Sequence, residues 1–145
     1  MNNEDFEIVK ETELIEVESC CGKTDCRNQV KKWFIAKIVK EDIFLNLINY
    51  LERNTLKELS ERWDENPKIT KDKVLNIEND ILSKGNYEHF APLIVRNFSD
   101  AEKKEFKDKE YYLEDGFHRS LAIADLLCTG KIDFGPIKIY FGDVR

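Results

Sequence analysis

The sequence predicts an α/β fold, a small mixed sheet with flanking helices, on three observations. The chain has 145 residues, 41% of them apolar, which is enough for one domain with a buried core. Its second half alternates short apolar runs, typical of strands, with amphipathic runs, typical of helices. Three prolines and six glycines punctuate the chain, and there is no internal repeat. Folds of this class bind ligands beyond the C-terminal ends of strands.

The first third of the chain mixes strand and helix signals. Residues 6–18 partly alternate β-branched and acidic side chains, which predicts a strand or a hairpin with one solvated face. Residues 20–28 are expected to form a loop, and residues 32–39 either a strand or the start of a helix. From residue 42 the spacing becomes helical, with a stripe of Ile43, Phe44, Leu47, Ile48 and Leu51.

Two more helices are predicted in the middle of the chain. A capping box at Thr55 and Glu58 starts the first, which ends near Pro67. Thr70 is the expected N-cap of the second, and Gly85 closes it. The apolar residues of this second helix recur at intervals of three or four, at Val74, Ile77, Ile81 and Leu82.

The last third predicts strands alternating with helices. A capping box at Ser99 and Glu102 starts a short helix. A longer helix is expected at 117–129, ended by Gly130. The strands around these helices are expected at 92–96, 110–114 and 137–141.

The predicted organisation is an N-terminal extension over residues 1–63 packing on a core over residues 64–145, together one compact domain. The net charge of −6 lies in the first eighteen residues of the extension. Residues 1–18 hold seven of the 29 acidic side chains and one of the 23 basic ones, so the remainder is neutral. This distribution argues against long nucleic acids as partners, and residues 1–18 are a candidate surface for a basic protein partner.

A cytoplasmic location is expected, because no run of about 20 apolar residues spans a membrane and the N-terminus lacks the pattern of a secretory signal. The four cysteines are expected to stay reduced. Cys20, Cys21 and Cys26 lack the spacing of a zinc knuckle, which leaves a metal site, a redox role and ordinary loop thiols as alternatives. Cys128 is expected to be a small core residue.

The segment with the clearest chemistry is residues 113–122. A strand leads to Gly116, and the helix that follows carries His118 and Arg119 in its first turn. Cations there oppose the helix dipole, and a bound anion reverses that cost. Free amides, a glycine and a guanidinium together are typical of a phosphate site. Asp115 is placed to hold Mg²⁺, orient His118 or accept a hydroxyl.

A structural alternative stays open for the same residues. Asp-Gly is a common turn dipeptide, so Asp115 and Gly116 can be an ordinary turn. His118 or Arg119 can equally pair with Glu114 or Asp115 without binding any ligand.

The motif Asp-Gly-Phe-His-Arg at residues 115–119 resembles the Asp-Gly-His-His-Arg type signature of the ParB and sulfiredoxin-like superfamily. The upstream order is similar as well, with Asn66-Pro67, a helix, Lys84-Gly85 and the strand at 92–96. The resemblance covers about residues 64–142. It implies a small α/β fold that holds the phosphates of a nucleotide on the motif turn and the following helix.

This resemblance implies roles for individual residues. Gly116, His118 and Arg119, with the adjacent Ser120, correspond to phosphate contacts, while Asp115 and His118 are the expected catalytic residues and Asp115 the expected Mg²⁺ ligand. The superfamily includes CTP-dependent partition clamps, cysteine-dependent sulfiredoxins, free-serine kinases and adaptors of DNA-modification systems. A nucleotide (ATP, ADP or CTP) with Mg²⁺ is therefore the expected ligand.

The sequence departs from the superfamily pattern in ways that exclude some branches. Phe117 stands where sulfiredoxins carry their nucleophilic cysteine, and the chain has no room for the DNA-binding domain of the partition clamps. The kinase branch also uses an acid from its N-terminal half as a base. Candidates for it are Glu65, Glu78 and the acids of residues 1–18, and His89 is a candidate on the substrate side.

Two functions from different classes follow. The first is an enzyme, kinase-like or nucleotide-hydrolysing, that performs Mg-dependent phosphoryl transfer, with a small hydroxyl compound as the acceptor. The alternative is a noncatalytic adaptor or inhibitor that binds a basic protein through residues 1–18. A nuclease ranks below both, because the sequence offers no basic stripe as a nucleic-acid track.

Overall fold

The structure is a computed structural model that describes residues 5–21, 30–47, 71–107 and 110–145. The chain divides into two compact units, each assembled from separate stretches of sequence. Unit 1 comprises Met1–Leu47, Ala91–Gly116 and Pro136–Arg145, and unit 2 comprises Ile48–Phe90 and Phe117–Gly135. The predicted boundary at residues 63 and 64 lies outside the described residues.

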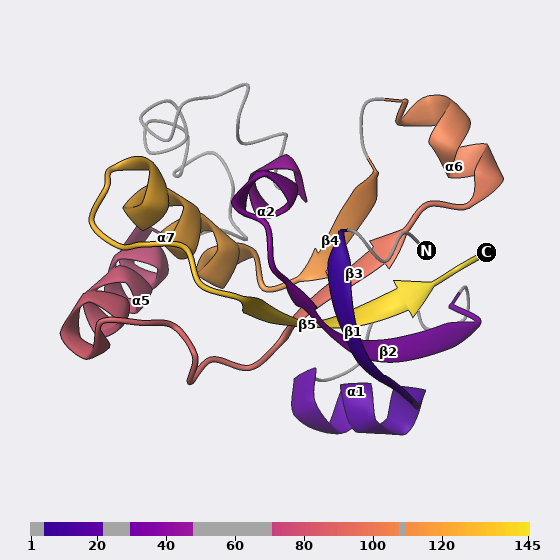
Figure 1. Cartoon of the computed structure of the whole chain (residues 1–145), viewed down its shortest axis with the longest axis horizontal. Helices are drawn as coiled ribbons and strands as arrows, with labels where there is room; N and C mark the ends of the chain where they lie inside the picture. The colour runs from indigo at the N-terminus through magenta and orange to yellow at the C-terminus, as the bar shows by residue number, and fades with distance from the viewer. Residues whose placement is uncertain (1–4, 22–29, 48–70, 108–109) are drawn as a thin grey trace. The chain divides into compact units, whose positions relative to one another are not determined.

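Unit 1 is built on a five-stranded mixed sheet in the order β1-β2-β5-β3-β4 (Figure 1). Its strands are β1 (Phe6–Thr12), β2 (Lys32–Ile38), β3 (Leu93–Asn97), β4 (Tyr111–Asp115) and β5 (Ile137–Asp143). The central strand β5 runs parallel to β3 and antiparallel to β2. The predicted α/β class with a mixed sheet is confirmed, and residues 32–38 form a strand rather than a helix.

One face of the sheet packs against α1 (Leu14–Cys21). Trp33 of β2, Ile94 of β3 and Tyr140 of β5 form a buried cluster with Val17 of this helix. Each of the four side chains is at most 7% exposed, so removing them from water stabilises this side of the sheet.

The opposite face carries an aromatic cluster. Phe6, Tyr111 and Phe141 lie with their ring centroids 4.7 to 5.8 Å apart, and the Tyr111 hydroxyl donates a 2.6 Å hydrogen bond to Asp5 Oδ2. The short helix α2 (Glu41–Leu47) contacts β2 and β4, with Phe44 fully buried.

The helix α6 (Asp100–Glu105) begins at the predicted capping box. The Ser99 hydroxyl accepts from the backbone N–H of Glu102, and the Glu102 carboxylate accepts from the backbone N–H of Ser99. The two bonds satisfy amides that would otherwise have no partner inside the helix.

In unit 2 the helices α5 (Lys71–Lys84) and α7 (Phe117–Cys128) pack against each other. Both end at a predicted glycine in the left-handed conformation, Gly85 with a φ of 77° and Gly130 with a φ of 70°. The Gly85 amide donates to the carbonyl of Ile81 at 2.7 Å, which closes the last turn of α5.

Two local expectations at the front of the chain are wrong. The strand of residues 6–18 stops at Thr12, and the chain turns into α1, whose first turn is fixed by the Glu16 and Val17 amides donating to the carbonyl of Glu13. Cys20 and Cys21 belong to this helix rather than to a loop. The alternating pattern led to a wrong prediction because Val17 is buried as part of a helix rather than of a strand.

Two burial expectations in unit 2 are also wrong. Of the predicted apolar stripe of α5, Val74 and Ile81 are buried, but Leu82 is 45% exposed and the acid Glu78 is buried between the other two. Cys128 is exposed because it ends α7, beyond the buried face. The predicted helix after Thr55 and the residues Ile48 and Leu51 lie outside the described residues.

Among the described residues, no helix is both long enough and apolar enough to span a membrane.

Candidate functional site

The predicted motif lies where β4 leads into α7. β4 ends at Asp115, and α7 begins at Phe117. Gly116 between them has a φ of 99°, a backbone conformation that L-residues avoid, so the glycine is required by the turn itself. The strand, turn and helix predicted for residues 110–129 are thereby confirmed.

His118 is partly buried in the first turn of α7. Burial lowers the pKa of His118 below its ordinary value, and the nearby positive charge of Lys73 in α5 lowers it further. The charge of Lys73 therefore disfavours protonation of His118, and a positive charge at the start of a helix also opposes the helix dipole.

Arg119 and Ser120 complete the first turn of α7. Arg119 is partly exposed, whereas Ser120 is fully buried. The Ser120 hydroxyl oxygen has no hydrogen-bond partner among the described residues. A buried hydroxyl without a partner costs free energy, and such groups in folded proteins call for an explanation.

A pair of carboxyl groups lies farther along the same two helices. Glu78 of α5 is 6% exposed and hydrogen-bonded to Asp125 of α7. Burial, this hydrogen bond and the charge of Asp125 raise the pKa of Glu78 to about 8, although Lys131 opposes the shift. At neutral pH Glu78 is therefore protonated and shares its proton with Asp125, which allows it to act as an acid or a base.

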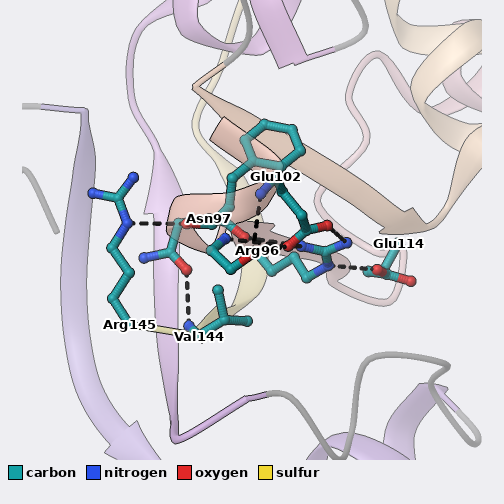
Figure 2. A network of polar contacts seen from close by, with 8 residues as sticks. Arg96, Asn97, Glu102, Glu114, Val144 and Arg145 are labelled. Atoms are coloured by element: carbon teal, nitrogen blue, oxygen red, sulfur yellow. Dashed lines mark hydrogen bonds and ion pairs between the residues drawn. The ribbon is translucent and has the colours of Figure 1, made fainter. Parts of the chain in front are cut away.

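In unit 1 the residue before Asp115 is held by a buried arginine (Figure 2). Arg96 Nε donates to Glu114 Oε1 at 2.7 Å, and its two terminal nitrogens donate to the two oxygens of Glu102 at 3.0 and 2.9 Å. The Arg96 guanidinium lies 4.8 Å from the ring centroid of Tyr112. Each carboxylate thus faces a cation, and hydrogen bonds from Arg96 lower the pKa of Glu102 despite its burial.

The other predicted site residues lie elsewhere. His89 Nε2 contacts Asp80 Oδ2 of α5 at 2.5 Å, and its ring lies tilted against that of Phe90, with the ring centroids 4.2 Å apart. The hydrogen bond from His89 lowers the pKa of Asp80. Its substrate-side role stays a prediction, and Glu65 lies outside the described residues.

The described residues contain no group of three or more histidine, cysteine or acidic side chains able to hold a metal ion. Cys26 lies outside them, so the predictions for the cysteines at 20, 21 and 26 stay open. Of the acidic front segment, Glu7 and Glu11 on β1 and Glu13 and Glu16 near α1 are exposed.

Two residues of interest were missed by reasoning from the sequence. Lys73 stands 45 positions before His118, and Arg96 was assigned only to a buried strand. A signal was present for Arg96, because an arginine in the middle of an apolar strand requires partners for its charge. Nothing in the sequence marks Lys73, whose significance depends on how α5 packs on α7.

A scan against protein-family models, a search of curated proteins and a search of solved structures each found no match.

Proposed function

We propose that the chain binds a nucleotide with Mg²⁺ and transfers or hydrolyses its terminal phosphoryl group, as the resemblance to the ParB and sulfiredoxin-like superfamily implies. The observation that carries the proposal is the start of α7. A strand, a glycine with positive φ and a helix whose first turn holds His118 and Arg119 form a segment suited to phosphate.

The electrostatics of unit 2 support the same conclusion. Lys73 of α5 adds a cation near His118, and burial together with this charge lowers the pKa of the histidine in the absence of ligand. A phosphate bound at this position reverses the effect, because a nearby negative charge favours the protonated imidazole. Arg119 supplies the planar group that binds two phosphate oxygens at once.

The protein offers few ligands for Mg²⁺, so the ion fits here only when the phosphates of a nucleotide also bind it. Mg²⁺ is commonly bound by one or two carboxylates together with substrate phosphates, and Asp115 offers one carboxylate. When bound, Mg²⁺ neutralises charge on the phosphate oxygens. Asp115 would hold the ion or accept the proton of a hydroxyl acceptor, His118 and Arg119 would hold the phosphates, and the Gly116 amide would donate to them.

The first experiment is a thermal-shift screen of ATP, ADP and CTP, each with Mg²⁺, followed by calorimetry on the nucleotide that raises the midpoint most. Arg119→Ala is expected to weaken binding at least about tenfold, since charged hydrogen bonds contribute about 1.5–3 kcal/mol. Lys84→Ala is the matched control, because it removes a cation from the far end of α5. Equal affinity of wild type and Arg119→Ala would overturn the site.

A direct reporter is the imidazole of His118. An NMR titration is expected to show its pKa rising when the nucleotide binds, so that the complex takes up a proton near neutral pH. An unchanged titration in the presence of saturating nucleotide would place the phosphates elsewhere.

The alternative, a noncatalytic adaptor, is supported by the front of unit 1. β1 is an edge strand, and it exposes Glu7, Glu11 and Val9. An exposed edge bordered by acids can pair with a basic segment of another protein. A phosphate-release assay separates the two functions: release with any of the three nucleotides supports the enzyme, and saturable protein binding without release supports the adaptor.

A further inference from the structure

We infer that the carboxyl pair of Glu78 and Asp125 makes phosphate binding at the start of α7 depend on pH, with binding strongest while the two groups share a proton. The inference rests on the proposed function, because it concerns the phosphate that this helix start is proposed to hold. The two carboxyl groups and the cations at the start of α7 all belong to unit 2.

The two carboxyl groups meet where α5 and α7 pack side by side (Figure 1). Glu78 of α5 is 6% exposed, and Asp125 of α7 is partly buried. A carboxylate only accepts hydrogen bonds, so the hydrogen bond between these side chains requires a proton on one of them. The pair therefore carries one negative charge with the proton and two without it.

The charged groups that act on Glu78 determine when the proton is lost. Among the described residues these groups are Asp125 of α7 and Lys131, which lies just beyond that helix. Burial, the hydrogen bond to Asp125 and the charge of Asp125 raise the pKa of Glu78 to about 8, and Lys131 opposes the shift. The second negative charge therefore appears as the pH rises through about 8.

The pair lies close enough to the proposed phosphate site to act on it. Lys73 acts on His118 near the start of each helix. Glu78 meets Asp125 farther along both, so α5 and α7 run in the same direction. Asp125 follows His118 by two helical turns, so both side chains project from the same side of α7, about 10 Å apart.

A second negative charge at this distance opposes the binding of phosphate. At an effective dielectric constant of about 20, two unit charges about 10 Å apart change a binding constant roughly tenfold, and salt reduces the effect. The coupling is reciprocal, so bound phosphate holds the proton on the pair more tightly. Phosphate binding near pH 8 is therefore accompanied by the uptake of a proton.

The experiment uses two variants of the pair and a matched control. Glu78→Gln keeps a hydrogen-bond donor for Asp125 and is uncharged at every pH, so it imitates the protonated pair. Asp125→Asn removes a charge that raises the pKa of Glu78, so the proton is lost at lower pH. Asp80→Asn is the control, because Asp80 also lies on α5 and its hydrogen bond with His89 lowers its pKa, which keeps it ionised.

Calorimetry measures the affinity for the nucleotide that binds the wild type best, with Mg²⁺, at pH values where circular dichroism shows a folded chain. The titration of the nucleotide and of His118 is common to all variants, so the readout is the ratio of each variant's affinity to that of wild type. From about pH 7 to about pH 9 this ratio is expected to rise about three- to tenfold for Glu78→Gln and to stay constant for Asp80→Asn.

A second measurement counts protons. Calorimetry at about pH 8, repeated in buffers of different ionisation enthalpy, is expected to show that wild type takes up more protons per bound nucleotide than Glu78→Gln. Asp125→Asn serves if Glu78→Gln does not fold, and its additional proton uptake is expected at lower pH than that of wild type.

A constant ratio for Glu78→Gln, or equal proton uptake by this variant and wild type, overturns the inference. A ratio for Asp80→Asn that changes with pH as much as that for Glu78→Gln also overturns it, because the effect then does not belong to the pair. A wild type that binds none of the three nucleotides at any pH overturns the proposed function, and the inference with it.

Discussion

The two units treat their buried charges in opposite ways. In unit 1 the carboxylates of Glu102 and Glu114 face the guanidinium of Arg96, and hydrogen bonds from that arginine lower the pKa of Glu102. In unit 2 the carboxyl group of Glu78 faces the carboxyl group of Asp125, and its pKa is raised to about 8.

The same contrast holds for the cations. Arg96 is surrounded by acids, whereas His118 has the cation Lys73 for a neighbour, and burial together with that neighbour lowers its pKa. Opposite charges brought together fix a structure, and like charges brought together leave groups whose protonation changes near neutral pH. We therefore assign a structural role to the cluster around Arg96 and expect the groups that change protonation near neutral pH to lie in unit 2.

The largest expected effect comes from breaking the opposite-charge cluster. Arg96→Met leaves the side chains of Glu114 and Glu102, 11% and 28% exposed, without a cation and is expected to cost about 3–5 kcal/mol of unfolding free energy. Urea denaturation at pH 7 measures it, and amide exchange in β3 localises the loss to unit 1. A loss below 1 kcal/mol, of the size typical of surface ion pairs, would show that the cluster is solvated.

The next largest expected effect is on the stability of unit 2, through the carboxyl pair of Glu78 and Asp125, and it falls in a defined pH range. Because the pKa of Glu78 is raised in the folded chain, its contribution to stability is full below about pH 4.5 and is lost as the pH rises through about 8. Glu78→Gln removes this dependence, so relative to wild type it should gain on the order of 4 kcal/mol between pH 5 and pH 8.5. Amide exchange in α5 and α7 across this range measures the difference.

In unit 1 the pKa shift of Glu102 predicts a pH dependence of stability with the opposite sign. Its pKa is lowered, so its contribution is present above about pH 4.5 and is lost as the pH falls through the folded value. Ser99→Ala, which removes a hydroxyl bonded to this carboxylate and to the start of α6, should cost about 1 kcal/mol at pH 7. Thermal unfolding measures this loss of stability. An equal loss at pH 3 would show that the contribution of the Ser99 cap does not depend on the charge of Glu102.

The smallest expected effect is at the cationic end of unit 2. Lys73→Gln removes a repulsive neighbour, so the pKa of His118 should rise in the free protein and stability should increase by a few tenths of a kcal/mol. If the proposed function holds, the same variant binds nucleotide more weakly. An NMR titration tests the pKa of His118, and calorimetry tests nucleotide binding. An unchanged pKa of His118 in Lys73→Gln would show that Lys73 does not act on this histidine.

The sequence predicted those parts of the fold whose signals are local. The capping box at Ser99 and Glu102 and the closing glycine Gly85 each fix a helix end through atoms a few residues apart. The helix at Leu14–Cys21 was missed because its sequence also alternates, and the packing of Val17 on the sheet decides between the two.

The residues of the candidate site also divide into those with a local signal in the sequence and those without one. Residues 115–120 are consecutive, so the motif could be placed on a turn and a helix start from the sequence. Glu78 is one of several candidate acids that the sequence offers, but its pairing with Asp125, like the positions of Lys73 and Arg96, depends on packing and register, which the sequence does not encode locally. The shift in the pairing of β3 with β4, between Leu113 and Asp115, is a further example, because residue 114 is not a glycine and nothing in the sequence marks the shift.

The strand order also determines when this protein can fold during synthesis. β5 is the central strand, yet it is the last of the five to leave the ribosome, about 100 residues after β2 begins. Until residues 137–143 appear, β1–β2 and β3–β4 are separate antiparallel pairs whose inner edges lack their partner. Nascent chains stalled before residue 137 should therefore depend on chaperones, and completion of the sheet is a late event with a high contact order.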